Sequence, residues 1–282
     1  PQLREGVDEA YALLGKRCGE LELPVAVRSS ATAEDLPGAS FAGLHDTFLN
    51  VKGGAPLHHA VVRCFASLYT DRALLYRREK GFDESDVALS VGIQQMIRVD
   101  GGSSGVMFTI EPDSGFPHVV LVQGSWGYGE SVVKGSVVPD QFLVFKPALA
   151  RGLSRPVLER SLGSKRTKLV CAPAGHGAES EEEPEAGGIA TELVEQEVPA
   201  HERAMFCLET DQVVRLAGWG VQIEKHYGKP MDLEWVREEE TGTLWIVQAR
   251  PETVHSAGRR DLDAFEFTKT VPDPILMGVS VG

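Results

Sequence analysis

Apolar and polar residues alternate along two runs near the C-terminal end of the chain, residues 228–236 and 244–251. Both runs have a strand-like composition, and the polar segment 237–243 between them contains a Thr-Gly pair that favours a turn. The pattern therefore predicts a β-hairpin with one apolar face and one polar face.

The polar face of this predicted hairpin carries Asp232 and Glu234 on the first strand, and Gln248 and Arg250 on the second, because side chains alternate along a strand. If the strands pair antiparallel with Glu234 opposite Gln248, Asp232 falls opposite Arg250. Carboxylate and amide oxygens suit Mg²⁺, and a guanidinium can bind a terminal phosphate through two hydrogen bonds. The alternative is a solvated hairpin whose Asp–Arg pair contributes only ~0.2–1 kcal/mol. The hairpin pattern alone leaves both interpretations open.

Helical spacing of apolar residues predicts three further helical stretches, at residues 3–18, 57–81 and 210–227. The second is expected to break at residues 69–72, and the third to be capped by Thr210 and ended by Gly228. Short strands are expected at residues 23–27, 47–51, 87–97, 105–110, 119–123 and 141–145. The strands at 87–97 and 105–110 are expected to pair with each other through a Gly-Ser-rich turn at 100–104. Together these elements predict an α+β protein.

Residues 28–43 form a long segment of small and hydroxyl side chains with Arg28 at its start. Small side chains let backbone N–H groups approach phosphate oxygens, and hydroxyls add donors. The alternative is an Ω-loop packed on its own residues. The segment is not a Walker A loop, because no Gly-Lys-Ser/Thr sequence closes it.

Two further features have a functional and a structural interpretation. The segment Gln94-Gln95-Met96-Ile97 ends a predicted strand, so its backbone could bind an adenine edge while Met96 and Ile97 enclose the ring, or it could be an ordinary half-buried strand end. Arg72 lies where the second helical stretch breaks, and it could bind phosphate or merely cover surface with its aliphatic stem.

Composition narrows the function classes. The 282 residues are enough for one large domain or two lobes, and the apolar and charged fractions, 42% and 24%, are those of a globular protein. A net charge of −13 argues against nucleic acid and against anionic membrane surfaces as partners. No apolar run reaches membrane-spanning length, and no signal peptide is evident. The four scattered cysteines lack a CxxC pair, which indicates reduced thiols, a cytoplasmic location and no zinc site.

Residues 175–188 contain five Glu among Gly, Ala, Ser and Pro and no large apolar residue. This composition predicts a mobile acidic surface loop, since it offers too little apolar area to offset the entropy of ordering. A metal-binding role is the alternative, but nothing in the segment would fix a coordination geometry. The chain starts at Pro1 within a helical pattern and stops inside an apolar run, so we expect a fragment cut at both ends.

Six segments carry a family resemblance: residues 27–43 (VRSSATAEDLPGASFAG), 66–77 (ASLYTDRALLYR), 103–109 (SSGVMFT), 129–142 (GESVVKGSVVPDQF), 223–235 (IEKHYGKPMDLEW) and 246–254 (IVQARPETV). Together they resemble the ATP-binding domain of the phosphoenolpyruvate synthase family, whose wider group includes pyruvate phosphate dikinase, rifampicin phosphotransferase and glucan, water dikinase. The resemblance implies an ATP-grasp fold, in which two α+β lobes clamp Mg-ATP. It also favours the ligand-binding interpretation of the hairpin.

The resemblance implies a set of site residues. Arg28 and Arg250 match the family's phosphate-binding arginines with catalytic roles, and Arg72 matches the Arg of its DRA motif. Glu234 and Gln248 match its metal ligands, and Asp232 matches an acidic position that we assign to the metal as well. The expected nucleotide-binding residues are Arg28, Ser29, Ser30, Thr32, Arg72, Gln95, Met96, Ile97, Glu234, Gln248 and Arg250. The implied cofactor is Mg²⁺, with ATP as substrate.

The resemblance further implies a domain organisation and a reaction. Residues 1–255 would form the nucleotide-binding domain, without the family's Gly-Gly-Lys-Asn segment upstream of Pro1, and residues 256–282 a linker towards a phosphohistidine domain. The Thr-Cys-His motif of that domain is absent from this sequence. In the family's reaction, a histidine of the absent domain attacks the β-phosphate of ATP, water removes the terminal phosphate, and the histidine phosphorylates pyruvate on a barrel domain. The products are phosphoenolpyruvate, AMP and phosphate, a kinase-type transferase reaction of pyruvate metabolism and gluconeogenesis.

The same nucleotide-site motifs allow two alternatives. One is the ATP-binding domain of an antibiotic kinase similar to rifampicin phosphotransferase, and the other is a non-catalytic nucleotide-binding module. By itself the fragment is expected to contain most of an ATP site without completing the full reaction.

Overall fold

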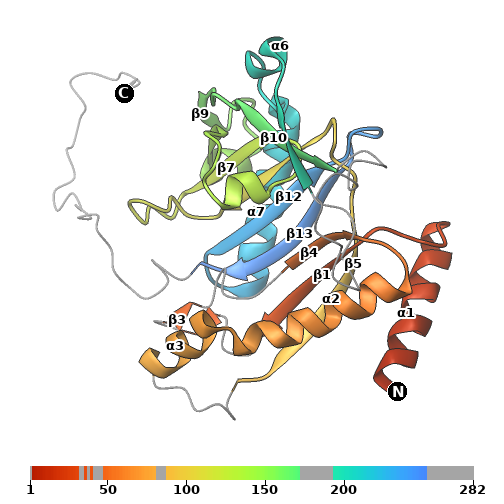
Figure 1. Ribbon diagram of the computed structural model, residues 1–282. Helices are drawn as coiled ribbons and strands as arrows, with labels where there is room; N and C mark the ends of the chain where they lie inside the picture. Colours follow the sequence, from red (N-terminus) through yellow and green to blue (C-terminus); the bar gives the residue numbers. More distant parts are fainter. Residues whose placement is uncertain are drawn as a thin grey trace, which may run out of the picture.

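The structure, a computed structural model, describes residues 2–31, 35–36, 39–40, 47–80, 87–171 and 193–252. Within these ranges the chain is an α+β protein with two main antiparallel sheets of three and six strands. Each sheet has its own hydrophobic cluster and its own covering helix (Figure 1). No helix in this part of the chain combines the length and apolar character needed to cross a membrane.

The three-stranded sheet has the order β4 (Thr47–Val51), β1 (Val25–Ala31), β5 (Leu89–Gln95). Val25 and Val27 of the central strand are fully buried against α2 (Gly54–Ala66), whose buried side includes Leu57 and Cys64. The helix α1 (Gln2–Cys18) packs beside α2, and its Tyr11 hydroxyl donates to the Leu23 carbonyl over 2.8 Å. One face of β1 therefore packs in the core against α2, and side chains on its opposite face can contact other parts of the molecule.

The chain continues from α2 through η1 (Ser67–Tyr69) into α3 (Asp71–Lys80), so the predicted break at residues 69–72 is confirmed. The Thr70 hydroxyl accepts a hydrogen bond from the Ala73 backbone N–H over 3.3 Å and caps the new helix. The predicted helix at residues 3–18 and the predicted strand at residues 47–51 are confirmed as well.

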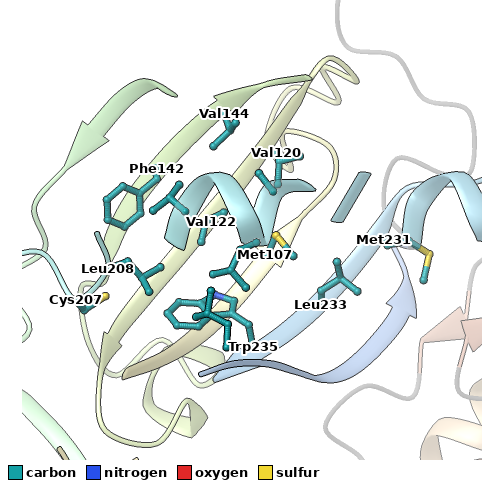
Figure 2. Packing of buried hydrophobic residues seen from close by; sticks show 14 of the residues in the cluster. Met107, Val120, Val122, Phe142, Val144, Cys207, Leu208, Met231, Leu233 and Trp235 are labelled. Carbon is teal, nitrogen blue, oxygen red and sulfur yellow. The ribbon is translucent and has the colours of Figure 1, made fainter. Parts of the chain in front are cut away.

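The six-stranded sheet has the order β13 (Leu244–Pro251), β12 (Met231–Arg237), β6 (Ser103–Phe108), β7 (Val119–Trp126), β8 (Asp140–Phe145), β9 (Val157–Ser161). One face packs on α7 (Thr210–Tyr227) and forms the larger hydrophobic cluster. Figure 2 shows Phe142, Met107 and Trp235 gathered in this cluster from three different strands. Both Leu233 and Trp235 of β12 are fully buried here, so Asp232 and Glu234 project from the opposite face.

The smaller elements are β2 (Asp35–Leu36), β3 (Ala39–Ser40), α4 (Glu130–Val133), α5 (Lys146–Ala150), α6 (Ala200–Arg203) and the hairpin of β10 (Thr167–Cys171) with β11 (Leu193–Glu197). A fully buried ion pair joins Lys165 to Asp140, the first residue of β8. The second carboxylate oxygen of Asp140 accepts the Cys207 backbone N–H over 2.8 Å, and its first accepts that of Gly163 over 2.8 Å. Asp140 thus joins the start of β8 to two neighbouring loops.

Three predictions about elements were wrong. The segments 87–97 and 105–110 do not pair with each other: β5 pairs with β1, whereas β6 lies between β12 and β7 in the other sheet. The first strand begins at Val25 rather than residue 23 and continues through Arg28 to Ala31, because β5 pairs with it along that whole length. The cap of α7 is Glu209, whose carboxylate and Gln212 form a capping box, so Thr210 is the first helical residue.

Candidate nucleotide-phosphate site

The two sheets meet through a group of polar side chains that we call the inter-sheet cluster: Arg28, Asp232, Glu234, Gln248 and Arg250. The Arg28 side chain projects from the face of β1 opposite Val25 and Val27, towards the β12–β13 hairpin. One of its nitrogens, Nη1, lies 3.2 Å from Glu234 Oε2 and also donates to Gln248 Oε1. Figure 1 shows β1 on the side of α2 that faces this hairpin.

The hairpin has the predicted register. Asp232 pairs with Arg250 and Glu234 with Gln248 across β12 and β13, and a bulge follows Glu234. The register places the four polar side chains in two adjacent rows on one face of the sheet. The sequence prediction that this hairpin gathers two carboxylates, an amide and a guanidinium on one surface is therefore confirmed.

Asp232 and Arg250 form a close ion pair within the hairpin. Arg250 Nε and Nη2 lie 2.7 and 2.6 Å from Asp232 Oδ2, and the Asp232 side chain is only 13% exposed. Burial raises the pKa of the Asp232 carboxyl above its ordinary value, and the nearby Arg250 charge opposes that rise without cancelling it. The carboxylates of Glu234 and Glu252 raise this pKa further. The raised pKa thus reflects chiefly the burial of this carboxyl, with Arg250 as its counter-charge.

The buried side of the hairpin fixes this surface in place. Trp235 is fully buried, and its Nε1 lies 3.2 Å from the carbonyl oxygens of both Val106 and Gln123. A side chain on Gly124 would lie 2.6 Å from the Trp235 ring, so the indole packs directly on the glycine backbone. A ring locked on the core face holds the backbone of the adjacent Glu234, and hence the direction of its carboxylate.

One contact between the sheets was not predicted from the sequence. Gln94 lies on the same face of β5 as Gly92, which pairs with Arg28, and its Nε2 donates to the Val247 carbonyl over 3.4 Å. Gln94 and Arg28 therefore connect the three-stranded sheet to the same edge of the six-stranded sheet. The signal that could have identified Gln94 is its polar character within a strand whose alternate residues are apolar.

The remaining predicted nucleotide-binding residues lie outside this cluster. Ser30 is exposed on the Arg28 face of β1, whereas Ser29 lies on the α2 face, because side chains alternate. Arg72 is exposed in the first turn of α3 and has no ion pair with the cluster among the residues that the structure describes. Thr32, the acidic segment 175–188 and the segment 256–282 lie outside the described residues.

The expected adenine segment begins at Gln95, the last residue of β5, and continues through Ile97. The Gln95 side chain accepts a hydrogen bond from Cys18 Sγ over 3.3 Å, on the side of α1. The Met96 backbone N–H donates to the Pro24 carbonyl over 2.9 Å, and Met96 Sδ accepts from the Asn50 backbone N–H over 2.9 Å. Ile97 is half-buried just beyond. These contacts hold the segment at the Val25 end of β1, three residues along the strand from Arg28.

The cluster offers a fit for Mg²⁺. In the described ranges no three His, Cys, Asp or Glu side chains form a ready-made metal site. However, a carboxylate oxygen of Glu234 and the amide oxygen of Gln248 both converge on one positively charged atom, Arg28 Nη1. Mg²⁺ commonly takes one or two protein oxygens and completes its shell with phosphate and water oxygens. Two converging oxygens are thus a suitable partial ligand set.

Residues 1–266 match the family described as pyruvate phosphate dikinase, AMP/ATP-binding domain. The phosphoenolpyruvate synthase of Helicobacter pylori is 44% identical over 292 residues, which cover 99% of this chain and 34% of that protein. The Escherichia coli phosphoenolpyruvate synthase is 48% identical over 261 residues, which cover 92% of this chain and 31% of that protein. The Deinococcus radiodurans phosphoenolpyruvate synthase is 46% identical over 280 residues, which cover 99% of this chain and 33% of that protein. The chain thus spans about a third of these relatives, and the resemblance inferred from its motifs is confirmed.

Proposed function

The chain belongs to the pyruvate phosphate dikinase AMP/ATP-binding domain family, and from that premise we propose that it is the nucleotide-binding part of an enzyme of the phosphoenolpyruvate synthase type. In this proposal the three- and six-stranded sheets are the two lobes of an ATP-grasp fold, and Mg-ATP lies between them. The whole enzyme would convert ATP, pyruvate and water into phosphoenolpyruvate, AMP and phosphate.

The observation that carries the proposal is the meeting of three side chains from strands far apart in the sequence. Arg28 comes from the central strand of one sheet, and Glu234 and Gln248 come from the edge hairpin of the other, 206 and 220 residues further on. A polyphosphate with its divalent ion needs a positively charged hydrogen-bond donor for the phosphate and oxygen ligands for the metal, and both kinds of group are present at this point.

Each member of the inter-sheet cluster has a distinct role in this proposal. Arg28 and Arg250 bind phosphate oxygens and offset the charge that develops during phosphoryl transfer. Asp232 orients Arg250 through the pair of short contacts to Nε and Nη2. Glu234 and Gln248 would hold Mg²⁺, with Asp232 as a further oxygen ligand; when bound, the ion neutralises phosphate charge. The chain itself supplies positioning and electrostatics rather than a nucleophile.

The rest of the proposed enzyme lies in the two thirds of the relatives that this chain does not cover. We expect a phosphohistidine domain to receive the phosphoryl group and a pyruvate-binding barrel to use it, with residues 256–282 leading towards them. The proposed location is the cytoplasm, where ATP and pyruvate are available. The proposed partners are ATP and these two domains.

The proposal is tested by titrating Mg²⁺ with a non-hydrolysable ATP analogue into the chain and following binding by calorimetry. Glu234→Ala should weaken binding at least about tenfold, because it removes the charged metal ligand. Glu240→Ala is the matched control, since Glu240 is an exposed residue in the turn of the same hairpin. Equal affinities for the two variants would contradict the proposed site.

A further inference from the structure

Arg28 occupies the position that the proposed metal would take. Its Nη1 is bonded to Glu234 Oε2 at 3.2 Å and to Gln248 Oε1, and these two residues are direct partners across β12 and β13. Neither a carboxylate nor an amide oxygen can donate a hydrogen bond. The group between them must therefore be a donor or a cation, and here it is a guanidinium.

A guanidinium and a divalent ion cannot occupy this position together, because like charges at this separation repel strongly. With Arg28 in place, these two oxygens are satisfied, and no group of three or more His, Cys, Asp or Glu side chains in the described part of the chain is arranged to hold a metal ion by itself. A free metal ion would have to remove the guanidinium without compensation. Free metal is thus expected to bind poorly to the nucleotide-free chain.

The other end of the guanidinium is incompletely bonded. Arg28 Nε is buried and has no hydrogen-bond partner among the described residues. A phosphate typically binds Arg through two parallel N–H groups, and the Nε with a neighbouring Nη forms one such pair. Because Nε is buried where it stands, it can meet a phosphate only if the side chain moves away from Glu234 and Gln248.

We propose that Arg28 is an internal cation that holds Glu234 and Gln248 in the nucleotide-free state, and that a divalent ion enters only together with a nucleotide whose phosphates draw Arg28 away. This inference rests on the proposed function and adds an order of binding to it. Before the ligand arrives, the arginine keeps the two metal-binding side chains oriented and the two sheets in contact. Once phosphate is present, the same arginine becomes a phosphate ligand, and its former place becomes available to the metal.

The test measures binding of Mn²⁺ alone, as a probe for Mg²⁺, by loss of the free-ion signal in electron paramagnetic resonance. Arg28→Met removes the cation and should bind Mn²⁺ at least about tenfold more tightly than the wild type, because a charged hydrogen-bonding competitor is gone. Arg28→Lys keeps a cation and should stay close to the wild type. Arg98→Met, at an exposed arginine, makes the same change in net charge and should also leave Mn²⁺ binding unchanged.

A thermal melt provides a second readout that does not depend on activity. Mn²⁺ should raise the melting temperature of Arg28→Met, in which Glu234 has lost its counter-charge, but not that of the wild type. If circular dichroism shows that Arg28→Met does not fold, Arg28→Gln takes its place as a neutral, polar substitute. Mn²⁺ binding that is no tighter in the neutral variant than in the wild type overturns the inference.

The failure of this inference can be separated from the failure of the proposed function. Wild-type chain that takes up Mn²⁺ in the presence of a non-hydrolysable ATP analogue, combined with an Arg28→Met variant that gains no affinity for Mn²⁺ alone, overturns the order of binding and leaves the nucleotide site intact. Wild-type chain that binds Mn²⁺ neither alone nor with the nucleotide contradicts the proposed function, and the inference with it.

Discussion

Replacing Trp235 tests which face of the hairpin is buried in the core. Trp235 is the largest fully buried side chain in the described part of the chain, and its Nε1 contacts two carbonyl oxygens at 3.2 Å. Replacing a buried aromatic residue with Ala costs ~3–5 kcal/mol, and the loss of the indole hydrogen bonds argues against the lower end of that range. We expect Trp235→Ala to destabilise the chain by about 4 kcal/mol.

This destabilisation should lower the melting temperature by roughly 8–16 °C, at roughly 2–4 °C per kcal/mol for a chain of this size. Circular dichroism is the suitable assay, since the substitution removes a tryptophan and would disturb a fluorescence signal. The matched control is Trp245→Ala on the same hairpin, whose residue is 44% exposed and should cost less than about 1 kcal/mol. Equal melting temperatures for the two variants would refute the assignment of Trp235 to the core face.

The neighbouring residue gives the complementary half of the same prediction. Glu234 projects from the opposite face of β12, so Glu234→Gln should leave the melting temperature nearly unchanged while weakening nucleotide binding. A Glu234→Gln variant that melts as early as Trp235→Ala would show that both side chains pack in the core, against the alternation described here.

Three further predictions use the charged residues. Burial raises the pKa of Asp232 in the folded chain, so folding favours the neutral carboxyl. The contribution of this carboxyl to folding stability is therefore fully present below its unfolded pKa of about 3.9, and it is lost as the pH rises through the folded pKa. Asp232→Asn should therefore melt higher than the wild type at neutral pH, with a gap that closes near pH ~4, and a gap independent of pH would contradict this. Lys165→Met leaves the fully buried Asp140 carboxylate without its cation and should cost ~3–5 kcal/mol in urea denaturation; a loss below about 1 kcal/mol would show that the pair contributes little. Arg250→Ala should weaken binding of Mg²⁺ with an ATP analogue about 100-fold, as measured by calorimetry. Arg250→Lys should weaken this binding as well, because an ammonium group lacks the planar pair of N–H donors of a guanidinium. Near-wild-type affinity in either variant would argue against a phosphate-binding role for Arg250.

The hairpin could be predicted from the sequence because its information is local. Alternation with a period of two fixes which residues share a face, and the short turn between the strands limits the possible registers. The pairing of Asp232 with Arg250 and of Glu234 with Gln248 follows from those two constraints. Helix ends marked by Gly, such as Gly228 with its left-handed φ of 69°, were predictable for the same reason.

Partners of the other strands could not be predicted in this way. An apolar run indicates that a strand is buried, but it does not indicate which strand lies beside it. The predicted hairpin of β5 with β6 was wrong for this reason, since the two strands belong to different sheets. The strand β9 was missed because it is exposed along most of its length and shows no alternation of buried residues.

The contact of Arg28 with Glu234 also lies beyond sequence patterns alone. The two residues are 206 positions apart, and only the packing of two separate sheets brings them together. The family resemblance implied roles for both residues, yet it did not indicate that the arginine would lie between the two proposed metal ligands, Glu234 and Gln248. Burial of Arg28 Nε without a partner is likewise a property of the folded chain.

The most direct measurement is a crystal structure of the chain grown with Mg²⁺ and a non-hydrolysable ATP analogue at saturating concentration. We predict that the nucleotide phosphates lie between the two sheets, that Arg28 and Arg250 bind phosphate oxygens, and that Mg²⁺ lies about 2.0–2.1 Å from oxygens of Glu234 and Gln248. A nucleotide bound elsewhere, or a complex in which Arg28 still joins Glu234 to Gln248 while the metal lies apart from both, would contradict it.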